Sequence, residues 1–249
     1  MENVGQYKPF VKKMILLIVS NSLLFQSIDP DYFVKYMVEV GKSIKNPAHS
    51  TLRLSSLIYL ITGPLKNTIG SRIDTFAVAL AVALLHPVNA ENICKRARNI
   101  KHYLDLLDDM VPGKGEEREY IREMVRQLLM AADDKHVFDI IGEFAVVSES
   151  SEFNITENWD HHMIYMKCLV KLCDFSPYWA PHAIMVEALK AENPYPDMTD
   201  EFRDNYHYIV ASKIVQPLLT NFTNLVKMED VSSALTSNIL ELKCAATKE

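Results

Sequence analysis

The stretch Ile69–Cys94, IGSRIDTFAVALAVALLHPVNAENIC, decides the fold of this chain. Its centre, Thr75–Leu85, contains no charged residue, and a helix that is apolar all round has no side that faces water. We therefore expect this segment to be the buried central helix of an all-α fold. The pattern predicts that the helix ends at His86-Pro87, because proline disfavours helical geometry in the preceding residue and cannot donate a hydrogen bond.

The composition of the whole chain favours the same fold class. Of its 249 residues 49% are hydrophobic, and only 7 are glycine. The apolar residues recur in long windows without the alternation of strands, which favours helices. We see no internal repeat and no polar linker, so we predict a single domain over residues 1–249, with flexible ends at 1–10 and 243–249.

Periodicity and capping residues predict further helices on both sides of the central one. Asp29-Pro30-Asp31 starts a helix in the way typical of proline in a first turn, and Pro217 predicts a kink inside a long helix. The ranges that we predict are 12–26, 30–41, 50–61, 90–110, 116–144, 159–173, 179–191, 199–226 and 230–242.

The charge pattern argues against nucleic-acid binding. The formal net charge is -6, which does not suit a protein that binds phosphate backbones. One local exception is the basic group Lys95, Arg96, Arg98, Lys101 and His102. We interpret it as a solvated helix face, with RNA binding as the alternative.

Cysteine usage and hydropathy predict an intracellular protein, cytoplasmic or nuclear, without membrane contact. The four cysteines have no CxxC spacing, so they suggest neither a zinc ribbon nor a disulfide framework. The early apolar run Met14–Phe25 is interrupted by polar residues and is too short to cross a bilayer. The glycosylation patterns at Asn154 and Asn221 are then expected to stay unmodified.

Four collinear segments carry a family resemblance. They are AVALAVALLHPVNAEN (77–92), MAADDKHVFDIIGEF (130–144), MIYMKCLVKLCDFS (163–176) and PDMTDEFRDNYHYIVASKIVQPLL (196–219). Together they resemble the catalytic domain of class I cyclic-nucleotide phosphodiesterases, an all-α fold with an HD-type metal site. The resemblance covers nearly the whole chain and implies a compact, HD-domain-like multi-helix bundle.

The resemblance implies that the metal site is incomplete. In that family two metal ions, held by histidines and aspartates, activate the hydroxide that attacks phosphorus. The HD pair falls on His86-Pro87, so a side chain without a donor atom replaces the bridging aspartate. A second histidine ligand falls on Thr51, whereas an aspartate is kept as Asp174. This set implies no bound metal, no other cofactor and no catalytic residue.

The positions that bind the substrate in the family also differ in this chain. The purine-reading glutamine falls on His207 and the clamping phenylalanine on Val210. A base without the clamp aromatic loses its stacking partner. Simpler roles are also open: His86 as a buried polar residue with a neighbouring partner, and Asp174 as that partner or as the N-cap of the helix through Trp179.

These departures favour a phosphodiesterase-like pseudoenzyme that serves as a protein–protein interaction or scaffold domain in an intracellular complex, as a homo- or hetero-oligomer. Two alternatives stay open. One is a regulatory domain that binds a nucleotide or another small molecule in the vestigial pocket. The other is an active hydrolase that uses His49, His86 and Asp174 for a single metal.

Overall fold

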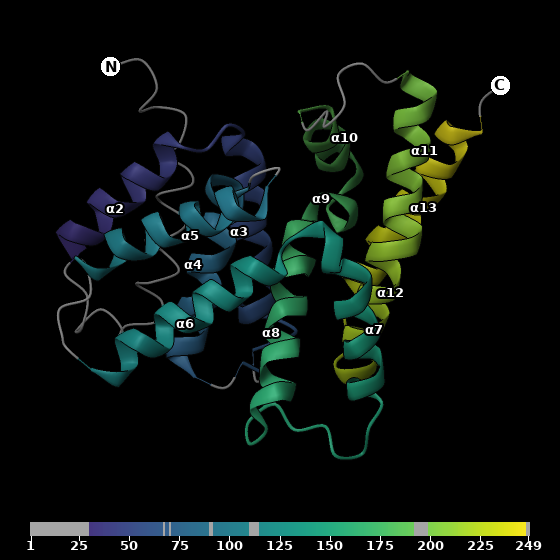
Figure 1. Ribbon diagram of the computed structural model, residues 1–249. Helices are drawn as coiled ribbons and strands as arrows, with labels where there is room; N and C mark the ends of the chain where they lie inside the picture. The colour runs from purple at the N-terminus through teal and green to yellow at the C-terminus, as the bar shows by residue number, and fades with distance from the viewer. Residues whose placement is uncertain are drawn as a thin grey trace. The chain divides into compact units, whose positions relative to one another are not determined.

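The computed structural model of the chain describes residues 30–66, 68–69, 71–89, 92–109, 115–191 and 199–247. Every regular element in these residues is a helix, and none of them is a strand, so the all-α prediction is confirmed. The HD-domain-like arrangement stays a prediction. Backbone contacts divide the chain into two compact units, Met1–Asp134 and Lys135–Glu249 (Figure 1). The predicted helix at 12–26 lies outside the described residues.

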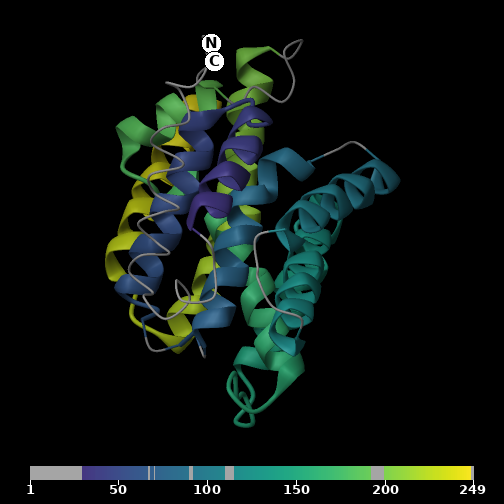
Figure 2. The ribbon, with the colours of Figure 1, turned by 90° about the vertical axis from the view of Figure 1, so that its left-hand side faces the viewer.

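The first unit is built around helix α4 (Arg72–Val88), which packs against the other described helices of that unit. These are α2 (Pro30–Lys42), α3 (Pro47–Thr62), α5 (Ile93–Asp108) and α6 (Glu116–Ala131). Figure 2, turned by 90°, also shows α5 and α6 alongside each other.

Helix α4 confirms the prediction of a buried central helix. Every side chain from Phe76 to Leu85 is at most 6% exposed. Its start is fixed by a capping box, in which the Ser71 hydroxyl accepts from the Asp74 N–H and the Asp74 carboxylate accepts from the Ser71 N–H. The helix runs one residue past the predicted end at His86-Pro87 and ends at Val88, since a proline in the last turn removes only one backbone bond.

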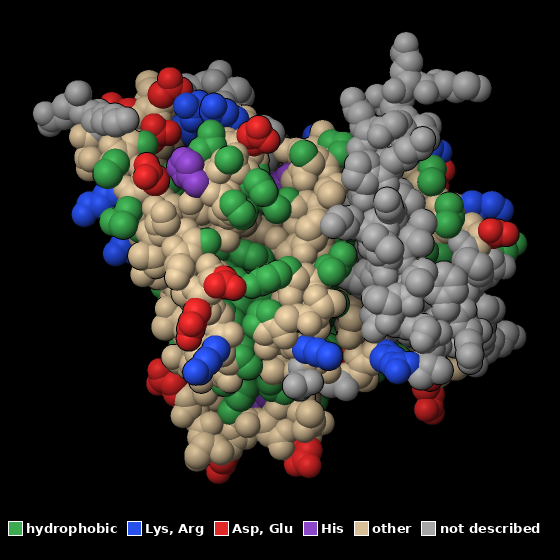
Figure 3. Space-filling view, turned by 180° about the vertical axis from the view of Figure 1, so that it is seen from behind, with side chains coloured by type: hydrophobic (Ala, Val, Ile, Leu, Met, Phe, Trp, Pro, Cys, Tyr) green, Lys and Arg blue, Asp and Glu red, His purple; other side chains and the backbone are tan. Residues whose placement is uncertain are grey.

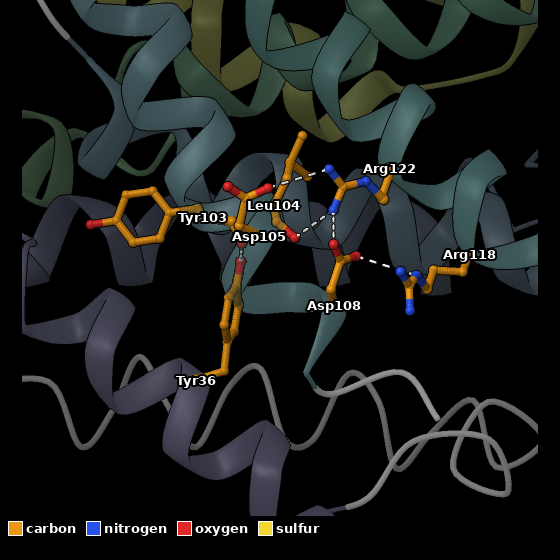
Figure 4. Close-up of polar contacts among 7 residues, drawn as sticks. All are labelled: Tyr36, Tyr103, Leu104, Asp105, Asp108, Arg118 and Arg122. Atoms are coloured by element: carbon orange, nitrogen blue, oxygen red, sulfur yellow. Dashed lines mark hydrogen bonds and ion pairs between the residues drawn. The ribbon is translucent and has the colours of Figure 1, made fainter. Parts of the chain in front are cut away.

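Helices α5 and α6 are joined by an arginine. The Arg122 guanidinium donates to the Leu104 carbonyl at 2.9 Å and to the Asp108 carboxylate, and lies 3.5 Å from Asp105 Oδ1 (Figure 4). Arg118 Nε lies 3.3 Å from the other oxygen of Asp108. Burial alone would lower the pKa of Arg122, but the bonds to Asp108 and Asp105 raise it, so the guanidinium stays charged.

The second unit contains the remaining helices. A 3₁₀ turn, Asp134–His136, precedes them. They are α7 (Val137–Ser148), α8 (Trp159–Asp174), α9 (Ser176–Trp179), α10 (His182–Ala191), α11 (Asp200–Val210), a π-helical turn (Ala211–Val215), α12 (Gln216–Leu225) and α13 (Glu229–Ala246). α13 packs along α11 and α9, whereas α7 packs against α8 and α12 (Figure 1).

An aromatic cluster forms the core between α7, α8 and α12. The Phe144 ring centroid lies 6.2 Å from that of Tyr165 and 5.1 Å from that of Phe222. All three side chains are fully buried. Tilted and edge-on arrangements at these distances add to the stabilisation that burial of the rings provides.

Two of the predicted helices are each divided in the structure. The range 116–144 is not one helix, because α6 ends at Ala131 and the chain turns at Asp133-Asp134, residues whose side chains favour turns over helix interiors. The range 179–191 is also divided. Pro181 separates α9 from α10, and the preceding Ala180 is extended, as a residue before proline prefers.

The predicted kink at Pro217 takes the form of a π-helical turn, Ala211–Val215, which ends two residues before the proline. Proline has no N–H for the carbonyl one turn earlier, and a wider turn accommodates that loss. The start of the helix predicted from residue 199 is fixed by Thr199, whose hydroxyl accepts from the Phe202 N–H at 3.3 Å. Among the described helices, none combines the length and the apolar character that crossing a bilayer requires.

Candidate functional site

The positions that the resemblance assigns to the metal site in the first unit lie on α3 and α4. His86 and Pro87 form the last turn of α4 and are half-buried. Thr51 lies in the first turns of α3, where its hydroxyl donates to the Pro47 carbonyl at 2.7 Å. His49 is buried at 2% exposure, and its backbone N–H donates to the Asn46 side chain. The bond to Pro47 keeps the Thr51 hydroxyl within its own helix.

Arg96 is buried beside the end of α4, which corrects its assignment to a solvated basic face. It is 6% exposed, and its Nη2 donates to Asn89 Oδ1 at 3.0 Å while Nη1 donates to the Leu129 carbonyl at 3.5 Å. Asn89 caps α4, and Leu129 lies in the last turn of α6. The negative ends of two helix dipoles therefore stabilise the buried guanidinium.

The other four basic residues of that group are exposed on α5, in agreement with the solvated-face interpretation. They are Lys95, Arg98, Lys101 and His102. Sequence periodicity does not separate Arg96 from them, because its partners Asn89 and Leu129 come from other segments of the chain.

In the second unit, Asp174 is the last residue of α8 and pairs with a buried lysine. Asp174 Oδ2 lies 3.4 Å from Lys171 Nζ, and the Lys171 side chain is 1% exposed. The Lys171 ammonium also lies 5.4 Å from the centroid of the Phe175 ring, within the range of a cation–π contact. A buried charge requires a partner of opposite sign, and the carboxylate of Asp174 provides one.

Asp174 is not the N-cap of the following helix, which was one of the simpler roles considered for it. The N-cap of α9 is Phe175, and no side chain makes a capping hydrogen bond there. Trp179 is held by packing and by one bond, from its indole Nε1 to the Leu172 carbonyl at 2.9 Å.

His207 is bonded to a tyrosine that the sequence did not single out. The Tyr178 hydroxyl and His207 Nδ1 are joined by a buried hydrogen bond of 2.9 Å, and His207 is 5% exposed. Asn238 fixes the backbone around that tyrosine, because its Nδ2 donates to the carbonyls of Tyr178 at 2.9 Å and Ala180 at 2.8 Å. Polar contacts thus join α9, α11 and α13.

The structure links two of the predicted positions, Asp174 and His207, through one cluster. We call it the α8–α9–α11 cluster, and its residues are Lys171, Asp174, Phe175, Tyr178 and His207. The Phe175 and Tyr178 rings connect its two polar pairs, with centroids 6.3 Å apart. Val210, the predicted clamp position, is buried at the end of α11, three residues past His207. The cluster can hold a fixed ion pair and a fixed imidazole orientation.

A hollow of about 350 Å³ lies elsewhere, between α2 and α5. Beside it, the Tyr36 hydroxyl donates to the Tyr103 carbonyl at 3.4 Å (Figure 4). Its lining combines aromatic and charged residues: Tyr32, Lys35, Tyr36, Glu39, Leu106 and Asp109. None of the positions that the family resemblance assigns is among them.

Within the described ranges, no three His, Cys, Asp or Glu side chains are grouped so that they could hold a metal ion. Comparisons with known proteins place the chain in no family: no protein-family model matches it, and neither does any curated protein. The resemblance to cyclic-nucleotide phosphodiesterases therefore depends on the four segments quoted above.

Proposed function

We propose that this chain is a phosphodiesterase-like pseudoenzyme, an interaction domain that binds other proteins and does not hydrolyse cyclic nucleotides. The resemblance of the four segments suggests the family, and the all-helical fold is compatible with it. The residues at the positions of the metal ligands support the loss of this chemistry.

The observation that carries the proposal is the Lys171 ammonium, 3.4 Å from the carboxylate of Asp174. Asp174 is the one aspartate ligand that the resemblance retains. A divalent cation bound to the same oxygen would lie at most about 5.5 Å from the ammonium, given an oxygen–metal distance of about 2.1 Å. The repulsion between the two cations is on the order of 6 kcal/mol at an effective dielectric constant of about 20. An ion pair with Lys171 therefore competes directly with a metal.

Two further positions support the same interpretation. Pro87 has no side-chain donor atom where the family has a bridging aspartate. The Thr51 hydroxyl is bonded to the carbonyl of Pro47 instead of presenting an imidazole nitrogen. Two octahedral metal ions need more oxygen and nitrogen ligands than His86 and Asp174 supply. A domain that keeps its fold without these ligands still has a surface with which it can bind other proteins.

A hydrolysis assay tests the loss of activity. We expect the purified chain to leave cyclic AMP and cyclic GMP intact with Mg²⁺, Mn²⁺ or Zn²⁺, under conditions in which an active phosphodiesterase converts both. Metal-dependent hydrolysis that is lost in His86→Ala and kept in His102→Ala would overturn the proposal. His102 is a suitable control because it is an exposed histidine on α5.

Thermal unfolding with nucleotides separates this proposal from a ligand-binding regulator. A ligand at 100 times its dissociation constant adds about 2.7 kcal/mol to the free energy of unfolding. We expect no shift with cyclic or linear nucleotides, because the His207 imidazole is already bonded to Tyr178. A shift that His207→Ala removes would favour the regulator instead.

A further inference from the structure

Helix α7 presents an apolar ridge to solvent. Figure 3 shows that exposed apolar side chains also gather on another face of the molecule. On α7, Phe138 and Val146 are 63% and 75% exposed and lie on one face with Gly142 between them, at spacing i, i+4, i+8. A Cβ at Gly142 would meet no atom within 4 Å, so the space above the glycine is open. We call these three residues the α7 ridge.

Two exposed carboxylates flank the α7 ridge. Asp139 and Glu143 each lie one position after a ridge residue, on the next row of the helix. Neither makes an ion pair with any residue in the described part of the chain. The ridge is therefore apolar along its centre and negatively charged along one side.

Helix α5 presents a face of the same spacing and opposite charge. Ile93 is 51% exposed, and Ala97 and Lys101 follow at i+4 and i+8 on the same exposed row. Arg98 and His102 lie beside them. Neither Lys101 nor Arg98 forms an ion pair within the described ranges, although Arg98 Nε donates to the Cys94 carbonyl at 3.4 Å.

We propose that the α7 ridge of one copy of this chain docks on the α5 face of a second copy. Rows at i, i+4, i+8 on both helices suit ridges-into-grooves packing at a crossing angle of about −50°. Gly142 and Ala97, the small residue at the centre of each row, let the two helices approach closely. In an antiparallel crossing, Val146 meets Ile93, and Glu143 lies beside Arg98.

The contact is heterologous, because each copy supplies one surface of each kind. Such association either closes into a ring or continues as a chain of copies. One helix pair buries less than the roughly 1,200–2,000 Å² of a stable interface, so we expect weak, salt-sensitive self-association. The inference goes beyond the proposed function, since it needs neither the vestigial metal site nor a foreign partner.

Sedimentation velocity of the full chain over a concentration series tests this inference. We expect the mean mass to rise with concentration at low salt. Glu143→Arg and Arg98→Glu should each weaken self-association about fivefold, the upper range for one exposed ion pair. An equimolar mixture of the two variants should restore association. The α7 ridge of the Glu143→Arg variant is complementary to the α5 face of the Arg98→Glu variant, and the reverse contact keeps the wild-type pair of Glu143 and Arg98.

Lys190→Glu, which reverses an exposed charge on α10, is the matched control and should associate like the wild type. A chain that stays monomeric at every concentration would overturn the inference, and so would association that both α5 and α7 variants leave unchanged. Either outcome leaves the hydrolysis assay of the proposed function unaffected, so the two failures are distinguishable.

Discussion

Removal of the Tyr120 hydroxyl is expected to weaken the anchor at the start of the central helix. The hydroxyl of Tyr120, on α6, donates to Asp74 Oδ1 at 2.6 Å. Asp74 is 4% exposed, and its other oxygen accepts from the N–H and the hydroxyl of Ser71 at 3.1 and 2.7 Å. This one carboxylate therefore caps α4 and also fastens α6 to it.

The structure sets the magnitude of the effect. A hydrogen bond to a charged group contributes about 1.5–3 kcal/mol, and we take the lower end because Tyr120 is only half-buried. Tyr120→Phe should then lower the free energy of unfolding by about 1.5 kcal/mol. Asp74→Ala should cost about 2.5 kcal/mol, since it also removes the capping box, which contributes about 1 kcal/mol.

A double-mutant cycle with urea unfolding, followed by circular dichroism, measures the coupling between the two residues. We expect the Tyr120→Phe and Asp74→Ala double variant to cost about 2.5 kcal/mol, which leaves a coupling energy of about 1.5 kcal/mol. Tyr59→Phe, at an exposed tyrosine on α3, should change the stability by less than about 0.5 kcal/mol. Fully additive effects would refute the reasoning, because they would mean that the bond stabilises nothing.

The same bond predicts a change with pH. Burial, followed by the bond to Asp74, raises the pKa of Tyr120 above its ordinary value of 10.0. The phenol of the unfolded chain ionises first as the pH rises, so the stabilisation is complete below about pH 10 and is lost above it. Unfolding curves between pH 8 and 11, as an approximate range around that value, should decline less steeply in Tyr120→Phe than in the wild type.

Two further predictions concern side chains of other kinds. Asn238→Ala leaves the carbonyls of Tyr178 and Ala180 without their donor, so it should cost about 2–4 kcal/mol in chemical unfolding, and a cost below about 0.5 kcal/mol would contradict this role. A thiol reagent should label the native chain at its two exposed cysteines and label all four after denaturation. The reason is that burial raises the pKa of Cys168 well above its usual value. Rapid labelling of that thiol in the native chain would contradict its burial. The exposed cysteines are Cys94 and Cys244, and the buried ones are Cys168 and Cys173.

The sequence allowed prediction of those parts of the fold that local chemistry decides. The uncharged run Thr75–Leu85 has no face for water, and α4 is buried from Phe76 to Leu85. Thr199 caps α11 because its hydroxyl reaches an N–H three residues ahead. Proline was harder to interpret, because its effect depends on its place in the helix. The helix predicted over 50–61 begins earlier, at Pro47, because the missing N–H of a proline costs nothing in the first turn of a helix.

The candidate site was less predictable, because its contacts join residues far apart in sequence. The segment MIYMKCLVKLCDFS drew attention to Asp174, but only the fold shows that Lys171 is buried beside it. Tyr178 and His207 are 29 residues apart, and no spacing rule pairs them. Partner choice of this kind is decided by the packing of α9 on its neighbours, which the sequence alone does not specify.

Metal stoichiometry tests the central claim most directly. The purified chain would be incubated with Mn²⁺ or Zn²⁺, separated from free ions by gel filtration, and analysed by atomic emission. The account predicts well under one ion per chain, because the Lys171 ammonium occupies the carboxylate of Asp174. About two ions per chain, lost together in His86→Ala or Asp174→Ala, would show that a two-metal site is intact and would contradict the account.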